Sequence, residues 1–235
     1  AYVGGFYATC MSAEEIESLI YSTEWNHGYR DRIDRSERRI RDKEYEDRYQ
    51  IKTAPGFRWG EIRAPRGVVQ GQNMLRILRE TSGNLPAIDS FDNLVNPYRS
   101  VATDIIDLEP VIIDKGYLVD AKMASMSVPG VLPPYEIDGK LLVDGGVTNN
   151  MPIDVARDLG ADIIIAIDIS SDYKGEDEFS SFLTVADQLS NYLVRRSTVL
   201  QQETLTDKDF FLQPDVGDMQ TTEFAKMPGA FQEGY

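Results

Sequence analysis

The segment that most constrains the fold of this chain is residues 139–170, where strand and helix signals alternate. Lys140-Leu141-Leu142-Val143 predicts a short buried strand, and Pro152 fits the first turn of a helix that Gly160 ends. The β-branched run at residues 162–167 is typical of a strand buried on both faces of a parallel sheet. Strand, helix and strand form a βαβ unit, so the segment predicts an α/β fold with a mainly parallel central sheet flanked by helices.

The rest of the chain fits the same fold class. Ser12-Ala13-Glu14-Glu15 is a capping box, which predicts a helix over residues 13–22. Apolar periodicity predicts further helices and strands. The expected helices are 74–80, 118–126 and 179–202, and the expected strands are 101–105, 111–113 and 210–212.

Size and composition indicate one folded domain over residues 1–235. The chain is 42% hydrophobic and 27% charged, which is ordinary for a globular domain. No stretch approaches the roughly 20 apolar residues of a transmembrane helix. The single cysteine, Cys10, excludes an internal disulfide framework and a multi-cysteine metal site.

Asp144 is the strongest candidate for chemistry, because it follows the predicted strand 140–143 and precedes Gly145 and Gly146. In open α/β sheets, ligands bind at the carboxyl ends of the strands. The two glycines allow a tight turn and a close approach of the backbone to a ligand. The same tripeptide also serves as a simple turn, in which the aspartate only caps the backbone.

Several ordered segments resemble the second half of bacterial patatin-like phospholipases. The segments are 69–73, 100–104, 124–134, 138–146 and 150–152, and the resemblance covers about residues 1–213. It implies a patatin-like α/β fold and a lipid acyl hydrolase of phospholipase A type that needs no metal or organic cofactor. It also implies that Asp144 is the general base of a Ser–Asp dyad.

The serine of such a dyad is not found in this sequence. No Gly-x-Ser-x-Gly nucleophile elbow and no glycine-rich oxyanion loop occurs among the 235 residues. Residues 1–8 resemble the helix that follows the elbow in the family. We therefore expect the serine, the N-terminal strands and the oxyanion loop upstream of Ala1, and we expect the Asp144 carboxylate to face the start of that helix.

Other polar residues have simpler explanations. A Ser-His-Asp triad would have to use His27, the single histidine, which lies in a turn of a charged region. Ser125 and Ser127 lie at a helix end and fit capping better than nucleophilic attack. Asp104 and Asp168 follow predicted strands, where they either line the same crevice as Asp144 or cap turns.

Charge is unevenly distributed along the chain. The net charge of −15 makes nucleic acid an unsuitable partner. Residues 27–66 hold twelve Lys/Arg and eight Asp/Glu, a balance of +4, which leaves 12 basic and 31 acidic residues, −19, elsewhere. We interpret residues 27–66 as a lid or interfacial insertion that meets an anionic membrane surface. The candidate lipid-surface contacts are Trp25, Arg35, Arg38, Arg39, Arg41 and Trp59. A solvated helix face over residues 35–48 is the alternative.

The sequence thus predicts hydrolysis of a phospholipid or lysophospholipid with Asp144 as base. A catalytically inactive lipid-binding module remains an alternative. A nucleotide or sugar-phosphate site at Gly145-Gly146 is a weaker alternative, because no phosphate-binding loop is present. The bacterial resemblance favours a secreted or outer-membrane-associated location, with a cytoplasmic one as alternative. Assembly as a homo-oligomer stays open.

Overall fold

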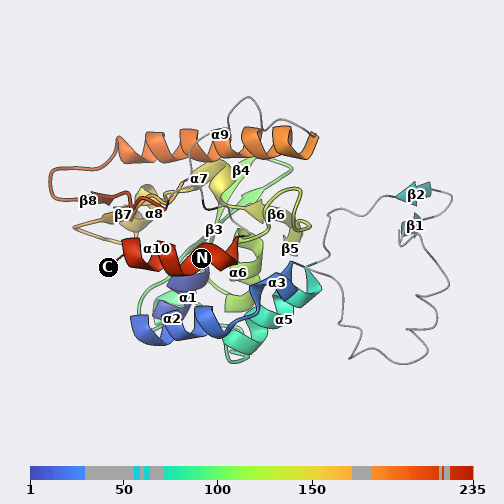
Figure 1. Cartoon of the computed structure of the whole chain (residues 1–235), viewed down its shortest axis with the longest axis horizontal. Helices are drawn as coiled ribbons and strands as arrows, with labels where there is room; N and C mark the ends of the chain where they lie inside the picture. Colours follow the sequence, from blue (N-terminus) through green and yellow to red (C-terminus); the bar gives the residue numbers. More distant parts are fainter. Residues whose placement is uncertain are drawn as a thin grey trace.

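The computed structural model describes residues 1–29, 56–58, 61–63, 71–170, 182–216, 219 and 223–234. In chain order its helices are α1 (Tyr2–Ala8), α2 (Ala13–Ser22), α3 (Trp25–Gly28), α5 (Gln72–Thr81), η1 (Phe91–Asn93), α6 (Leu118–Ser125), α7 (Gly146–Asn149), α8 (Ile153–Asp158), α9 (Phe182–Gln202), η3 (Phe224–Lys226) and α10 (Met227–Glu233). Its strands are β1 (Gly56–Arg58), β2 (Glu61–Arg63), β3 (Ser100–Asp104), β4 (Glu109–Ile113), β5 (Tyr135–Ile137), β6 (Lys140–Asp144), β7 (Ile165–Ile167) and β8 (Phe210–Leu212). The arrangement is an α/β fold (Figure 1).

The largest sheet has four strands in the order β4-β3-β6-β5, and every pair in it is antiparallel. Helix α6 packs against β3 and β6, while α7 contacts β3 and carries α9 above it (Figure 1). The expected parallel arrangement is therefore met only in part, by the pair β7–β8. The physical reason is a missed hairpin signal. Asp138 and Gly139, at φ of 51° and 78°, make the tight turn that joins β5 to β6.

The parallel pair β7–β8 is buried on one face only. Ile164 and Ala166 pack with α8, whereas Ile165 and Ile167 on the opposite face are 64% and 58% exposed. The expectation that this run is buried on both faces was wrong. Among the described strands β7 pairs only with β8, and helix α8 shields a single face of the pair.

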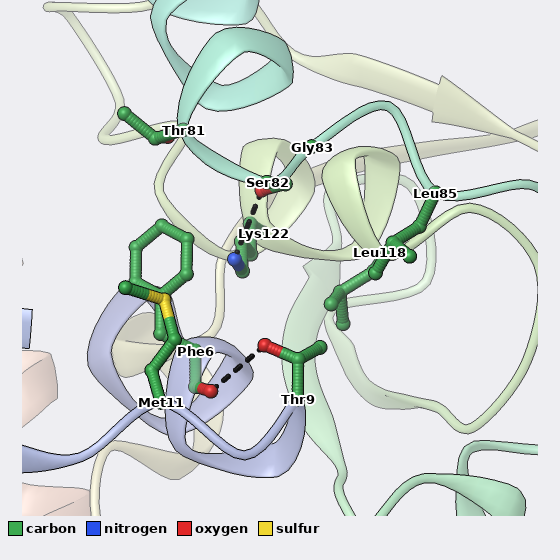
Figure 2. A pocket seen from close by; sticks show the side chains of 9 residues that line it. All are labelled: Phe6, Thr9, Met11, Thr81, Ser82, Gly83, Leu85, Leu118 and Lys122. Carbon is green, nitrogen blue, oxygen red and sulfur yellow. Dashed lines mark hydrogen bonds between the residues drawn. The ribbon is translucent and has the colours of Figure 1, made fainter. Parts of the chain in front are cut away.

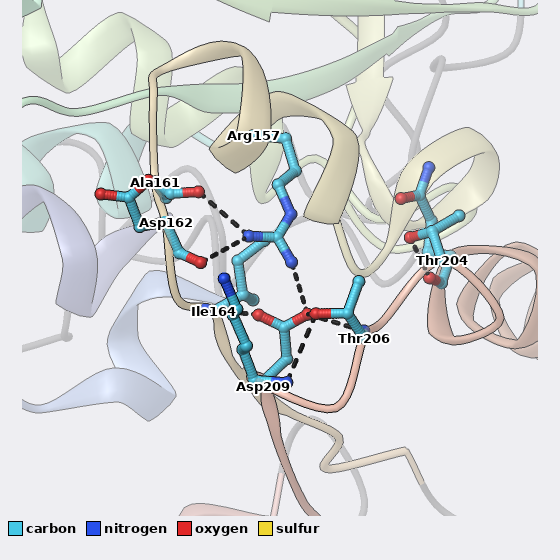
Figure 3. Close-up of polar contacts among 9 residues, drawn as sticks. Arg157, Ala161, Asp162, Ile164, Thr204, Thr206 and Asp209 are labelled. Atoms are coloured by element: carbon cyan, nitrogen blue, oxygen red, sulfur yellow. Dashed lines mark hydrogen bonds and ion pairs between the residues drawn. The ribbon is translucent and has the colours of Figure 1, made fainter.

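A cluster of polar contacts ties α8 to the starts of β7 and β8 (Figure 3). The Arg157 guanidinium forms an ion pair with Asp209 and donates to the carbonyl oxygens of Ala161 and Asp162 at 3.0 and 3.1 Å. Asp209 also accepts from the Ile164 amide at 2.8 Å. Backbone donors from Thr206 and Ile164, together with Arg157, lower the pKa of Asp209 to about 2. This carboxylate serves the structure of the β7–β8 region.

The predicted helices are confirmed close to their expected bounds. Ser12 caps α2 through the reciprocal contacts with Glu15 that the capping box predicts. Pro152 stands at the N-cap of α8, one residue earlier than expected. Among the helices that the structure describes, none has the length and apolar character needed to cross a bilayer.

The main core lies between α1, α2, α5 and α6 and is rich in aromatic side chains. Trp25 is 6% exposed, meets the Tyr2 ring edge-on at 4.8 Å and stacks on Phe224 at 5.7 Å. Its indole Nε1 donates to the carbonyl oxygen of Ile20 at 2.9 Å. The interpretation of Trp25 as a lipid-surface contact was therefore wrong, since packing against α1 hides the ring from solvent.

Candidate active site around Asp144

The backbone of Asp144 is held from two sides at the end of β6. Its amide donates to the carbonyl oxygen of Ser127 at 3.0 Å, and its carbonyl oxygen accepts from Thr103 Oγ1 at 2.9 Å. Ala102 of β3 stands opposite it in the sheet register. Strand β3 and the segment after α6 therefore fix the position from which the Asp144 carboxylate extends.

The carboxylate itself is partly buried and has one hydrogen-bond donor among the described residues. Oδ1 accepts from the Gly146 amide at 2.7 Å. Burial raises the pKa of Asp144, while the Gly146 hydrogen bond acts in the opposite direction. A carboxylate with a raised pKa is a stronger base than an exposed aspartate, and proton transfer is the chemistry that it can perform.

Gly145 and Gly146 are required by close packing around this turn. A Cβ added to Gly145 would lie 2.1 Å from the backbone oxygen of Val101, so no larger residue fits against β3. A Cβ on Gly146 would lie 3.0 Å from both Asp144 Oδ1 and Asn150 Oδ1. The absence of side chains at these two positions lets α7 begin directly beside the carboxylate. The glycines are therefore needed for close packing as well as for the turn.

Asp144 lies near the start of α1, because Ala1 and Asp144 are close enough for a charge on one to act on the other. Tyr29, just after α3, also lies near. Its pKa is raised by burial and then by the Asp144 charge. No local pattern indicated a place for Tyr29 beside Asp144, because its approach depends on how α3 packs.

The other carboxylates considered from the sequence have structural roles. Asp104 accepts from the Ile106 amide at 3.0 Å and forms an ion pair with Lys140 at 3.5 Å. The Ile106 hydrogen bond is the main cause of its lowered pKa. Asp168 accepts from the amide and the hydroxyl of Ser170 at the end of β7. Both cap turns after strands.

The two serines and the histidine considered from the sequence make local contacts, and most of the lipid-surface candidates lie outside the described residues. Ser127 Oγ donates to the carbonyl oxygen of Met123 at 2.8 Å, which is helix capping, and Ser125 is the last residue of α6. His27 lies in α3, with its Nδ1 3.2 Å from Glu24 Oε2. The candidate lipid contacts Arg35, Arg38, Arg39, Arg41 and Trp59, with most of the proposed insertion 27–66, lie outside the described residues.

Comparison with known proteins agrees with the resemblance seen in the motifs. The family model of the patatin-like phospholipases matches residues 1–157, which include α1, β3, β6 and the Asp144 turn. The chain belongs to the patatin-like phospholipase family. The matched part thus contains every group described above at Asp144, and it ends inside α8.

Individual relatives are similar over a little more than half of the chain. An uncharacterized NTE family protein of Mycobacterium tuberculosis is 31% identical over 134 residues, covering 57% of this chain and 36% of that protein. Patatin-like phospholipase domain-containing protein 6 of Mus musculus is 30% identical over 168 residues, and protein 7 of Rattus norvegicus 31% over 173. Each of these two matches covers 61% of this chain and 12% of the relative. The chain therefore spans only part of the relatives that it matches.

Proposed function

We propose that the protein is a lipid acyl hydrolase of phospholipase A type, with Asp144 as general base for a serine upstream of residue 1. The observation that carries the proposal is a partly buried carboxylate of raised pKa that lies near the start of α1. A serine hydroxyl needs a base within hydrogen-bond reach before it can attack an ester carbonyl. A carboxylate of raised pKa fits that task at neutral pH.

The proposed reaction has two stages. The serine oxygen attacks the ester carbonyl carbon while its proton moves to Asp144, and the lipid alcohol leaves with that proton as an acyl-enzyme forms. Water then gives a proton to Asp144 and attacks the acyl-enzyme, and Asp144 passes that proton to the serine oxygen as the fatty acid leaves. Membership of the patatin-like phospholipases supports a phospholipid or lysophospholipid as substrate.

The test is Asp144→Asn in the full-length protein. Asparagine keeps the shape of the side chain and can still accept from Gly146, but it cannot take the serine proton. We expect turnover of a p-nitrophenyl ester and of a lysophospholipid to fall by about 10² to 10⁴ fold. Asp158→Asn, at an exposed position at the end of α8, is the matched control and should keep wild-type turnover.

Folding of both variants is checked by circular dichroism. A folded Asp144→Asn protein with wild-type turnover would show that Asp144 is not the base. A full-length wild type that binds lipid vesicles without hydrolysing either ester would instead favour the inactive lipid-binding module.

We also propose that residues 27–66 bring the protein to anionic lipid. The support is their balance of +4 within a chain of −15. Replacing Arg35, Arg38, Arg39 and Arg41 by glutamine should reduce co-sedimentation with phosphatidylserine vesicles, because each basic residue near the surface contributes about 1 kcal/mol. Hydrolysis of a soluble short-chain ester should stay unchanged. Equal vesicle binding by variant and wild type at low salt would contradict this proposal and favour the alternative, in which these arginines belong to a solvated helix face.

A further inference from the structure

A cavity of about 260 Å³ lies between α1, the end of α5 and α6, and a lysine projects into it (Figure 2). None of its lining residues belongs to the Asp144 turn. Its apolar wall includes Phe6, Met11, Leu85 and Leu118. Gly83 at the lining is exposed and Met11 and Leu85 are partly buried, so the cavity reaches the surface beside them.

The lysine is Lys122, whose side chain is fully buried. Its Nζ donates to Ser82 Oγ at 3.1 Å and lies 3.5 Å from the centre of the Phe6 ring. Among the described residues no carboxylate lies within ion-pair distance of it. A buried ammonium is normally paired, because its desolvation costs several kilocalories per mole. Burial accordingly lowers the pKa of Lys122 to about 7.

The donors and acceptors around the cavity are unequally used. The hydroxyls of Thr9 and Thr81 donate to the carbonyl oxygens of Phe6 and Ile77, so their protons are not free for a ligand. The Lys122 ammonium has three N–H donors and uses one, on Ser82. In the part of the chain that the structure describes, the Ser82 hydroxyl accepts this bond and its own proton has no acceptor. Lys122 and Ser82 therefore each keep at least one proton that is not donated to an oxygen or nitrogen of the described residues.

We propose that this cavity binds the carboxylate of a short fatty acid, with Lys122 and Ser82 holding the two oxygens and the apolar wall holding the chain. Paired donors about 3 Å apart suit the two oxygens of a carboxylate, which forms charge-assisted hydrogen bonds. At about 30 Å³ for each water-sized group, the volume takes roughly eight or nine non-hydrogen atoms. Hexanoate has that size, whereas acetate lacks the chain and the last carbons of decanoate would extend out of the cavity into solvent.

The first test measures binding to full-length protein by isothermal titration calorimetry at pH 6.5, with hexanoate, acetate, decanoate and the neutral analogue hexanol. We expect hexanoate to bind at one site with a dissociation constant of about a millimolar, acetate and hexanol at least about tenfold more weakly, and decanoate no more tightly than hexanoate. Lys122→Met should weaken the binding of hexanoate at least tenfold and leave the affinity for hexanol unchanged. Lys115→Met, at an exposed position, is the matched control. Equal hexanoate binding by Lys122→Met and wild type would overturn the proposal.

A second measurement does not depend on whether Lys122→Met folds. The Lys122 resonance of the wild type is followed by NMR through a pH titration. Bound carboxylate favours the ammonium, so hexanoate should raise the midpoint from about 7 by about one pH unit for a tenfold preference. Among the described residues, the titratable side chain of α1 near Lys122 is Tyr2, whose ring centre lies 5.5 Å from Nζ. An unchanged midpoint at saturating hexanoate would also overturn the proposal.

The binding site and the proposed hydrolysis can fail separately. Hexanoate is already an acid and undergoes no reaction, so its binding does not require Asp144. The Asp144→Asn protein should therefore retain hexanoate affinity within about twofold while it loses ester turnover. Loss of hexanoate affinity in Asp144→Asn would assign the carboxylate to the Asp144 turn and not to the Lys122 cavity.

Discussion

Asp144 is the last residue of β6 and Asp209 directly precedes β8, and their surroundings shift the pKa values of these two aspartates in opposite directions. Asp209 accepts from the amides of Ile164 and Thr206, from the Thr206 hydroxyl and from Arg157. Its pKa falls to about 2. Asp144 accepts from the Gly146 amide alone among the described residues, and burial raises its pKa.

The difference shows how a carboxylate is committed either to structure or to chemistry. Hydrogen-bond donors to the carboxylate oxygens stabilise the charged form, so Asp209 stays deprotonated at neutral pH and is a weak base. A buried carboxylate with one donor keeps its remaining lone pairs available and is less stable when charged. Asp144 is therefore suited to accept a proton, and Asp209 is suited to hold α8 against β7 and β8.

Of the changes that test this comparison between Asp144 and Asp209, Gly145→Ala should have the largest effect on stability. The Asp144 environment depends on α7 beginning against β3, and an added Cβ would lie 2.1 Å from the Val101 oxygen. We expect the free energy of unfolding to fall by about 3 kcal/mol, since relief requires movement of backbone. Chemical denaturation measures this value, and ester turnover should fall with it.

Gly160→Ala is the control for this substitution. Gly160 has φ of +90° with nothing within 4 Å of an added Cβ, so the change tests backbone strain without a clash. Its cost should be about 1 to 2 kcal/mol with turnover per folded molecule unchanged. If Gly145→Ala were as stable as Gly160→Ala, close packing would not be what holds the Asp144 turn.

A smaller effect is expected from Asp209→Asn. The variant loses the ion pair with Arg157 and should lower Tm at neutral pH by roughly 3 to 6 °C, without changing turnover per folded molecule. Because the pKa of Asp209 is lowered when folded, its stabilisation is present above about pH 4 and is lost as pH falls towards 2. Calorimetry at pH 7 and pH 2.5 checks this, with exposed Asp207→Asn as control. A Tm difference as large at pH 2.5 as at pH 7 would assign the effect to shape and not to charge.

Local sequence signals located the Asp144 turn and most helices because those features depend on neighbouring residues. The Ser12 capping box and the strand before Asp144-Gly145-Gly146 are examples. Features that depend on distant contacts were missed. Trp25 is hidden by Tyr2 and Phe224, and the exposure of Ile165 follows from β7 having a single described neighbour.

The surroundings of the polar residues Lys122 and Asp209 also depend on distant contacts and could not be predicted from the sequence. A lysine in a helix normally faces solvent, and the available signal was that its neighbours Ala121, Met123 and Ala124 leave α6 without a polar face. Asp209 lies in a turn, and its role requires Arg157 more than fifty positions earlier in the chain. Neither pairing follows from spacing along the sequence.

The smallest effect tests the acidity of Asp144 directly, through stability and not activity. Because burial raises its folded pKa above 3.8, the folded protein binds more protons than the unfolded one between that value and the raised pKa. Stability therefore falls as pH rises through this window, and above it the charged carboxylate costs free energy that asparagine does not. Asp144→Asn should show a slightly higher Tm than the wild type at pH 7 and an equal Tm at pH 4 or below. Differential scanning calorimetry at the two pH values is the measurement, with Asp158→Asn as control. A Tm difference of the same size at both pH values would mean that the substitution acts through packing, and the contrast with Asp209 would then not rest on charge.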